Sequence, residues 1–297
     1  MKIIAQHQVP ADIAAIRVYD YCNGLFDAIP SRKGLKKTID GGLILVNDQV
    51  VKTGYWLKGG ENIKLIEKEI KPPGTYFKDL DIHFEDDHLA IIYKPAGLLV
   101  SGNQFKTVVN ALQHNLKPCE LPDALPWPRP VHRLDKATSG LLIIAKSKRA
   151  VMKLSQMFEE GEISKTYHAI VLGKLEGEGE INTTIDGKNA QTFYKSIGIY
   201  HSLRSTFLTL VELHPKTGRT HQLRIHLSEL GHAILGDPLY SPEHLKLKHK
   251  GLFLTADLLE FTHPVNYERI KIAVDLPKKF AKRLESESKR WKSAYLE

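Results

Sequence analysis

The stretch HRLDKATSGLLIIA, residues 132–145, constrains the fold of this chain most. Three ionisable side chains, His132, Arg133 and Asp135, stand before Thr138-Ser139-Gly140 and then the apolar run 141–145. Such a run is typical of a strand buried on both faces. A charge beside a buried strand needs a partner or solvent, because burying it unpaired is costly. The stretch therefore predicts that Asp135 lies at the edge of a sheet, in a cleft.

A second stretch, TGRTHQLR at 217–224, supplies cations that suit this acid. Arg219 and Arg224 lie at the start of a predicted helix. An opposing guanidinium would keep Asp135 ionised and oriented, lowering the carboxyl pKa by roughly 1 to 3. That suits a nucleophile or general base at neutral pH. On spacing alone a structural ion pair is the better interpretation, since such pairs far outnumber catalytic acids, and spacing does not choose between the two arginines.

The composition narrows the class of protein. The 297 residues are 42% hydrophobic and 26% charged, which fits one large domain or two unequal ones. The net charge of +8 permits nucleic acid or an anionic membrane as partner. No window approaches the ~20 apolar residues of a membrane span, and the N-terminus is not typical of a signal peptide. The two cysteines form no metal-ligand pattern and fit a reducing, cytoplasmic location.

The first 68 residues predict a small separate domain. Residues 31–40 favour a short helix that Ser31 caps and Gly41 ends. Four cations share one face of this helix because of their spacing: Arg32, Lys33, Lys36 and Lys37. A basic helix followed by short strands resembles the S4-like RNA-binding module, although the arginine-rich opening is reduced to Arg17. A solvated helix face is the competing interpretation.

The remaining chain predicts a mixed α+β domain. Residues 69–79 contain Pro72-Pro73-Gly74 and favour a linker, which leaves 80–297 as the second domain. Strand patterns flank Asp86-Asp87, and 147–161 favours an amphipathic helix. Thr220 is a plausible N-cap for the helix of the second stretch, and the C-terminal residues favour a charged surface helix. Strands outnumber helices and few βαβ units are present, so we expect a largely antiparallel sheet.

Several familiar motifs are incomplete. The HRLD run lacks the Gly-rich loop and DFG sequence of a protein kinase. PKTGRT lacks the end of a phosphate-binding loop. His221 and His226 are five residues apart, whereas helical metal pairs prefer three or four, so no metal site is predicted. Ser139 lacks the flanking glycines of a nucleophile elbow.

Four stretches in order resemble the RluA-type RNA pseudouridine synthases. They are IIYKPAGLLV, HRLDKATSGLLIIAKS, SKTYHAIVLG and PKTGRTHQLRIHLSELGHAILGDPLY, spread over residues 81–240. The resemblance implies a pseudouridine-synthase fold behind an S4-like domain. It also implies an isomerase that detaches uracil from its ribose at N1, turns it and rejoins it through C5.

The resemblance assigns roles to individual residues. Asp135 matches the essential aspartate, which either attacks the nucleotide or removes a sugar proton. Arg219 matches the arginine that pairs with it, with Arg224 as the competing partner. Tyr167 matches the tyrosine that packs on the target base and helps remove its C5 proton. Arg133 matches the arginine that fills the place of the flipped base, while Lys94 and His132 shape the pocket.

The partner implied is RNA, bound by Arg133, Arg224 and the basic helix. The S4-like module favours ribosomal over transfer RNA, acted on by a monomer without an obligatory protein partner, metal or cofactor. Two other classes remain open. A non-catalytic RNA-folding protein on the same scaffold would not need Asp135, and an aspartate-nucleophile hydrolase would be expected to carry a metal-binding acidic cluster.

Overall fold

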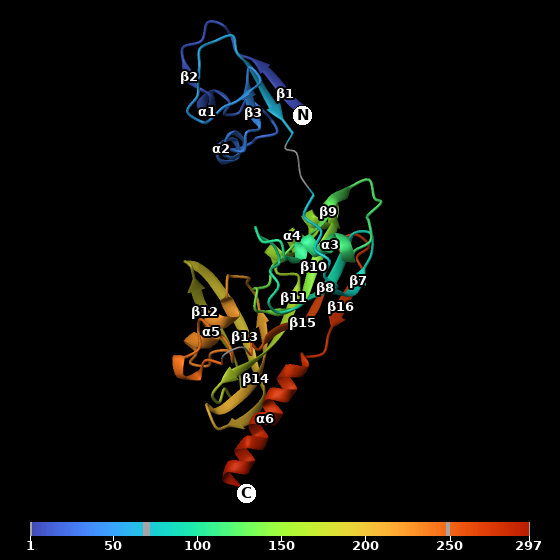
Figure 1. Cartoon of the computed structure of the whole chain (residues 1–297), viewed down its shortest axis with the longest axis vertical. Helices are drawn as coiled ribbons and strands as arrows, with labels where there is room; N and C mark the ends of the chain where they lie inside the picture. Colours follow the sequence, from blue (N-terminus) through green and yellow to red (C-terminus); the bar gives the residue numbers. More distant parts are fainter. Residues whose placement is uncertain (1, 68–71, 248–249, 297) are drawn as a thin grey trace. The chain divides into compact units, whose positions relative to one another are not determined.

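The computed structural model describes residues 2–67, 72–247 and 250–296. The chain divides into two compact units, Met1–Lys71 and Pro72–Glu297 (Figure 1). This division falls within the segment expected to be a linker, 69–79, of which residues 69–71 lie outside the described residues.

The first unit is a small α+β body. A four-stranded sheet has the order β1-β6-β3-β4, and β2 pairs with β5. Its core contains Val18, Leu35, Ile44, Leu57 and Ile63, each at most 1% exposed. The elements are β1 (Ile3–Gln8), β2 (Ile16–Arg17), α1 (Val18–Tyr21), α2 (Arg32–Asp40), β3 (Ile44–Val46), β4 (Gln49–Val50), β5 (Trp56–Leu57) and β6 (Asn62–Ile66).

Helix α2 begins and ends where the sequence indicates. The Ser31 side chain accepts the Gly34 amide at its start, and Gly41 is its C-cap. Leu35 and Ile39 face the core, whereas all four predicted cations are exposed: Arg32, Lys33, Lys36 and Lys37. Arg32 differs from the three lysines, because it pairs with Asp20 at 2.9 Å. The helix therefore presents a basic face to solvent.

The second unit is built on one large sheet of order β12-β13-β14-β11-β15-β10-β8-β7, with β16 on β15 and β9 on β10. Among the described strands, β10 pairs with β15 in parallel and the other neighbours are antiparallel. This confirms a mixed α+β fold on a largely antiparallel sheet. The strands are β7 (Asp81–Glu85), β8 (Leu89–Lys94), β9 (Ala124–Pro130), β10 (Ser139–Ser147), β11 (Ser164–Leu172), β12 (Glu178–Ile185), β13 (Lys188–Ser202), β14 (Thr206–Pro215), β15 (Leu254–Thr262) and β16 (Arg269–Ala273).

Helices cover this sheet (Figure 1): α3 (Val108–Asn115), α4 (Lys148–Glu160), α5 (Gln222–Glu229) and α6 (Lys278–Tyr295), with a short 3-10 turn at Glu243–Leu245. Ser147 caps α4 and Gly161 ends it, as expected. Helix α6 is not only a surface helix, because Phe280 and Leu284 pack in a core cluster beneath it. Thr220 is not the N-cap of α5. That position belongs to His221, whose backbone has a left-handed φ of 56° and whose side chain makes no cap.

Residues 76–80 follow the surface of α3 closely. The Tyr76 amide donates to the Asn110 carbonyl at 2.7 Å, and the Leu80 amide donates to the Asn115 side chain at 2.8 Å. This part of the predicted linker is therefore bound to the second unit.

Strand β10 fixes the loop that carries Asp135. All nine residues of β10 are buried, and Gly140 pairs with Ala256 of β15. A Cβ at Gly140 would lie 2.2 Å from the Ala256 carbonyl oxygen, and its φ is 133°. Only glycine allows this approach. On the other side of Asp135, Leu134 is buried in a core cluster, so the loop is anchored at both ends.

Candidate active site

Residues from distant parts of the second unit line one cavity of about 540 Å³. The Asp135 loop, the end of α4, the start of β11 and the segment 215–224 form its wall. Three of the four stretches singled out in the sequence therefore meet at one place. Asp135, Tyr167, Arg133, Arg219 and Arg224 all line this cavity.

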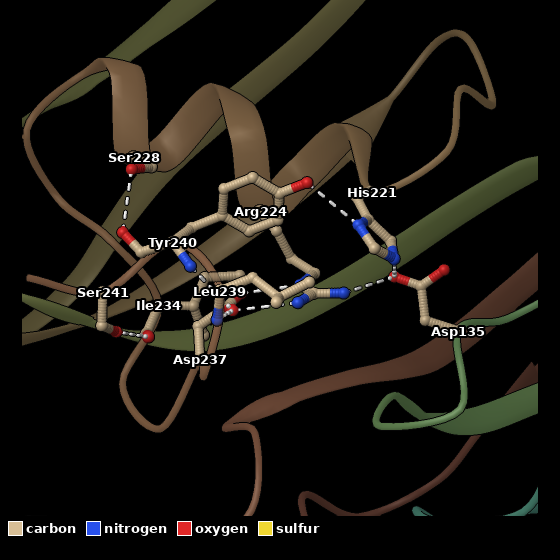
Figure 2. Close-up of polar contacts among 9 residues, drawn as sticks. All are labelled: Asp135, His221, Arg224, Ser228, Ile234, Asp237, Leu239, Tyr240 and Ser241. Atoms are coloured by element: carbon tan, nitrogen blue, oxygen red, sulfur yellow. Dashed lines mark hydrogen bonds and ion pairs between the residues drawn. The ribbon is translucent and has the colours of Figure 1, made fainter. Parts of the chain in front are cut away.

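Asp135 lies opposite Arg224 (Figure 2). The Arg224 Nη1 donates to Asp135 Oδ2 at 3.3 Å. The Asp135 side chain is 18% exposed and that of Arg224 only 4%. The guanidinium reaches the cavity from the buried side, so it offers the carboxylate a counter-charge without covering it. Asp135 remains open to a ligand.

Asp237 holds Arg224 in this position. Its Oδ2 accepts from Arg224 Nε at 2.6 Å and its Oδ1 from Nη2 at 2.9 Å. Burial opposes the charge on Asp237, but these hydrogen bonds and the amides of Leu239 and Tyr240 outweigh it and lower the pKa of the carboxyl. The guanidinium fork is thereby shared between a buried anchor and the carboxylate in the cavity.

The arginine that pairs with Asp135 is Arg224, which corrects the expectation for Arg219. Arg219 is exposed, and its Nε donates to the Asn189 carbonyl of β13 at 3.0 Å. Arg219 lies in the turn before α5, whereas Arg224 lies inside the helix and faces the core. The helical turn directs the second arginine, not the first, towards the Asp135 loop.

His221 and Tyr240 complete the surroundings of Asp135 (Figure 2). His221 Nε2 lies 3.7 Å from Asp135 Oδ2. Its Nδ1 lies 3.0 Å from the Tyr240 hydroxyl, and the Tyr240 ring lies against Arg224, 5.1 Å from ring centre to Cζ. Both contacts of Asp135 use Oδ2. Within the described residues Oδ1 accepts no hydrogen bond, so this oxygen is available to react.

Tyr167 lines the cavity from β11, as the sequence indicates. Its ring packs against two core clusters, one beneath the Asp135 loop and one beneath α5. Burial, aided by the charge of Asp135, raises the pKa of its phenol. Tyr167 therefore keeps its proton at neutral pH and presents an uncharged aromatic face.

Lys94 and His132 shape the surroundings of the loop. The buried Lys94 Nζ donates to the carbonyls of Pro95, Leu98 and Lys136. Burial lowers its pKa to about 8, against the pull of Asp135. His132 Nε2 accepts the Ile143 amide at 2.9 Å, and burial together with nearby Lys165 lowers its pKa to about 3. His132 is thus a neutral acceptor that ties the loop to β10.

Further cations line the cavity besides Arg224. Arg133 is exposed there, and Lys165 is half-buried. The Lys165 Nζ lies 5.5 Å from the centre of the Phe158 ring. Burial lowers the pKa of Lys165. The cavity wall therefore carries Arg133 and Lys165 in addition to the ion pair of Asp135 and Arg224.

The described residues contain neither a metal-binding cluster nor a membrane-spanning helix. No group of three or more histidine, cysteine or acidic side chains among them could hold a metal ion. No helix in the described part of the chain combines the length and the apolar character that crossing a bilayer requires.

Comparisons with known proteins identify the family. The family model described as RNA pseudouridylate synthase matches residues 88–229. Ribosomal large subunit pseudouridine synthase D of Nitrosomonas europaea is 34% identical over 289 residues, covering 86% of this chain and 80% of the relative. Dual-specificity RNA pseudouridine synthase RluA of Pasteurella multocida is 39% identical over 217 residues, covering 66% and 92%.

A solved structure shows the same relationship. Human RNA pseudouridylate synthase domain containing 1 superposes with a TM-score of 0.56 at 25% identity, covering 70% of this chain and 87% of that chain. The fold, the acid in its cavity and the relatives together define an RNA-modifying isomerase. The chain belongs to the RNA pseudouridylate synthase family, as an RluA-type RNA pseudouridine synthase.

Sequence reasoning missed four residues of this site: Lys165, His221, Asp237 and Tyr240. Asp237 and Tyr240 lie in the GDPLY end of the fourth stretch, where an acid and an aromatic follow a glycine. An acid next to apolar residues could have drawn attention to Asp237 as the anchor of an arginine. Nothing in the spacing indicates that His221 would turn towards Asp135.

Proposed function

We propose that this enzyme converts uridine to pseudouridine in structured ribosomal RNA, and that Asp135 carries out the first step. The observation that carries the proposal is the carboxylate of Asp135, ion-paired through one oxygen and open at the other, inside a cavity of about 540 Å³. The reaction breaks the N1–C1′ bond and forms a C5–C1′ bond. N1 gains a proton and C5 loses one, so no redox partner or group donor is needed.

Asp135 starts the cleavage, either by attacking the nucleotide or by removing a sugar proton. Both routes need the ionised carboxylate at neutral pH. Arg224 supports this form, because its guanidinium is held by Asp237 and needs no rearrangement when the substrate arrives. The catalytic partner that we assign to Asp135 is therefore Arg224, and Arg219 is left to contact RNA at the rim.

Tyr167 receives the uracil ring. A uridine inside a stem cannot expose its glycosidic bond and must be flipped out, at a cost of about a few kcal/mol. Stacking of the base on an aromatic ring returns roughly 1–3 kcal/mol. The exposed Arg133 is well placed at the rim to fill the space that the base leaves and to pair with phosphate.

The basic face of α2 supports a large, structured substrate. Three lysines of this face, Lys33, Lys36 and Lys37, are exposed, and an exposed cationic helix favours phosphate contacts. A ribosomal large subunit enzyme is among the relatives, and so is a dual-specificity one. We propose ribosomal RNA as the substrate, with transfer RNA as the alternative.

The test is tritium release from RNA labelled at uridine C5, because C5 must lose its hydrogen. Unmodified ribosomal and transfer RNA are each incubated with wild type and with Asp135→Asn. We expect release from ribosomal RNA that depends on Asp135. Release from transfer RNA alone would make transfer RNA the substrate instead. Tight binding with no release from either RNA would favour the RNA-folding alternative.

A further inference from the structure

Lys165 is a half-buried cation in the cavity wall, and the steps proposed above give it no role. It lies on β11 two residues before Tyr167, and both side chains line the cavity. Its ammonium sits over the Phe158 ring, 5.5 Å from the ring centre, on the side of the cavity that His132 also lines. Lys165 is thus fixed within the site, unlike a lysine on a solvated helix face.

No anion of the protein balances this charge in the described ranges. Burial is the cause that lowers the Lys165 pKa, without an opposing carboxylate. Glu159 also lines the cavity, but its side chain is exposed and makes no ion pair with Lys165 within the described residues. Asp135 is already paired with Arg224. A partly dehydrated cation without a partner is costly, so a bound anion would relieve that cost.

The anion that an RNA substrate brings is the phosphodiester. We propose that Lys165 binds a backbone phosphate adjacent to the flipped uridine and thereby positions the nucleotide for Asp135. A lysine is a compact point charge that suits phosphate. The inference rests on the proposed function, because it needs the target nucleotide to enter this cavity.

Two features fix where the phosphate goes. The Asp135 carboxylate repels a second anion, whereas the ammonium of Lys165 attracts one. Lys165 and Tyr167 come from one strand: Tyr167 pairs with Leu213 of β14 and Ala256 of β15, and Lys165 pairs with Leu259 of β15, with a register shift between Thr166 and Tyr167. Base and phosphate would therefore be held at a fixed separation by one structural element, which favours a single orientation of the sugar.

The experiment pairs a protein change with an RNA change. The probe is a synthetic stem-loop containing a uridine that the wild type modifies, with a neutral methylphosphonate replacing the phosphate on either side of it, one at a time. We expect Lys165→Met to lower kcat/KM by roughly 10- to 100-fold, as for a lost charge-assisted hydrogen bond. One of the two methylphosphonates should lower wild-type kcat/KM similarly.

The decisive result is non-additivity. The sensitive methylphosphonate should have almost no further effect on Lys165→Met, because both changes remove one contact. Full additivity at both positions would overturn the proposal. So would a wild type that is insensitive at both positions, and this arm does not depend on whether a variant folds. If the wild type releases tritium from no RNA, no such stem-loop can be chosen and the proposed function fails instead.

Matched controls separate charge, partner and fold. Lys153→Met removes an exposed cation from α4 and should leave kcat/KM unchanged. Glu159→Gln tests whether Lys165 merely serves that acid; a loss equal to that of Lys165→Met would contradict phosphate binding. Lys165→Arg keeps the charge and should recover part of the activity together with the methylphosphonate sensitivity.

Discussion

The cavity carries two sets of charges, called here its paired end and its open end, which differ in whether the protein supplies a partner. At one end Asp135 meets Arg224, which Asp237 grips through two further hydrogen bonds (Figure 2). At the other end Lys165 and Arg133 lack a carboxylate partner within the described residues. The first end is complete without RNA, whereas the second becomes neutral only when a ligand brings negative charge.

This difference shows which part of the site is preorganised before RNA binds. Bond cleavage requires a carboxylate in one orientation, and a preorganised dipole there costs no rearrangement during reaction. The end that receives the backbone gains from open cations, because phosphates displace counterions and bind in a salt-dependent way. Substitutions at the paired end should therefore affect turnover, and those at the open end should affect RNA affinity.

The largest effect is expected for Asp135. Asp135→Asn keeps the shape of the side chain but removes the charge, so tritium release should fall by roughly 10³-fold or more. RNA affinity should be unchanged or up to about threefold higher, because the variant no longer repels phosphate. The matched control, Asp275→Asn at an exposed position, should leave both unchanged. An active Asp135→Asn enzyme would remove this end of the cavity from the chemistry.

The next effect compares two arginines of one segment. Arg224→Lys loses the fork that links Asp237 to Asp135, so kcat/KM should fall by roughly 10²-fold. The free energy of unfolding should fall by about 3 kcal/mol, since a buried pair is broken. Arg219→Lys should change kcat/KM by no more than about threefold and should leave the free energy of unfolding nearly unchanged. Urea titrations and initial rates measure both quantities.

The opposite ranking would restore Arg219 as the partner of Asp135.

The stability of the protein in acid gives a second check on Arg224. The pKa of Asp237 is lowered in the folded protein, so its stabilisation is present above the unfolded value of about 3.9 and is lost as pH falls through the folded one. The gap in stability between wild type and Asp237→Asn should therefore narrow at low pH.

The same two arginines show how far sequence reasoning reaches. The residue types, the cavity they line and the sheet were predictable, because ordered motifs and alternating hydrophobicity carry them. Which arginine reaches Asp135 was not, because it depends on where the helix begins. Thr220 is a good N-cap by residue type, yet the left-handed His221 starts α5 one residue later. In its position before α5, His221 contacts Asp135 and Tyr240, and these tertiary contacts are not visible in the local sequence.

The β12–β13 hairpin has a clear sequence signal, whereas the position of Asp237 has none. The long hairpin of β12 and β13 turns at Asp186 and Gly187, whose φ values of 50° and 71° fit a two-residue turn. Asp-Gly between alternating residues is a strong hairpin signal. Asp237 could not be placed in the same way, because its partner Arg224 is thirteen residues away and the contact forms only when the loop after α5 folds back.

Tyr167 tests the aromatic part of the cavity wall. Tyr167→Phe keeps the aromatic face, so RNA affinity should stay within about twofold of wild type. Tyr167→Leu removes it, and affinity should fall roughly tenfold, the lower part of what a stacked base is worth. Filter binding measures both, with Tyr295→Leu at an exposed site as control. Equal losses in Phe and Leu would argue against stacking, and the kcat of the Phe variant reports separately on the hydroxyl.

The smallest effect is expected at the open end, for Arg133. Its side chain is exposed at the cavity rim, so Arg133→Gln should weaken RNA binding only about threefold at moderate salt. Because one phosphate contact is lost, the slope of log affinity against log salt should become shallower by about 1. Arg129→Gln removes another exposed charge, outside the cavity, and provides the reference slope. If Arg133→Gln instead lowers kcat at saturating RNA and leaves the slope unchanged, Arg133 acts after the RNA has bound, when the target uridine is flipped out. The open end would then be preorganised for catalysis as well, and the contrast between the two ends would disappear.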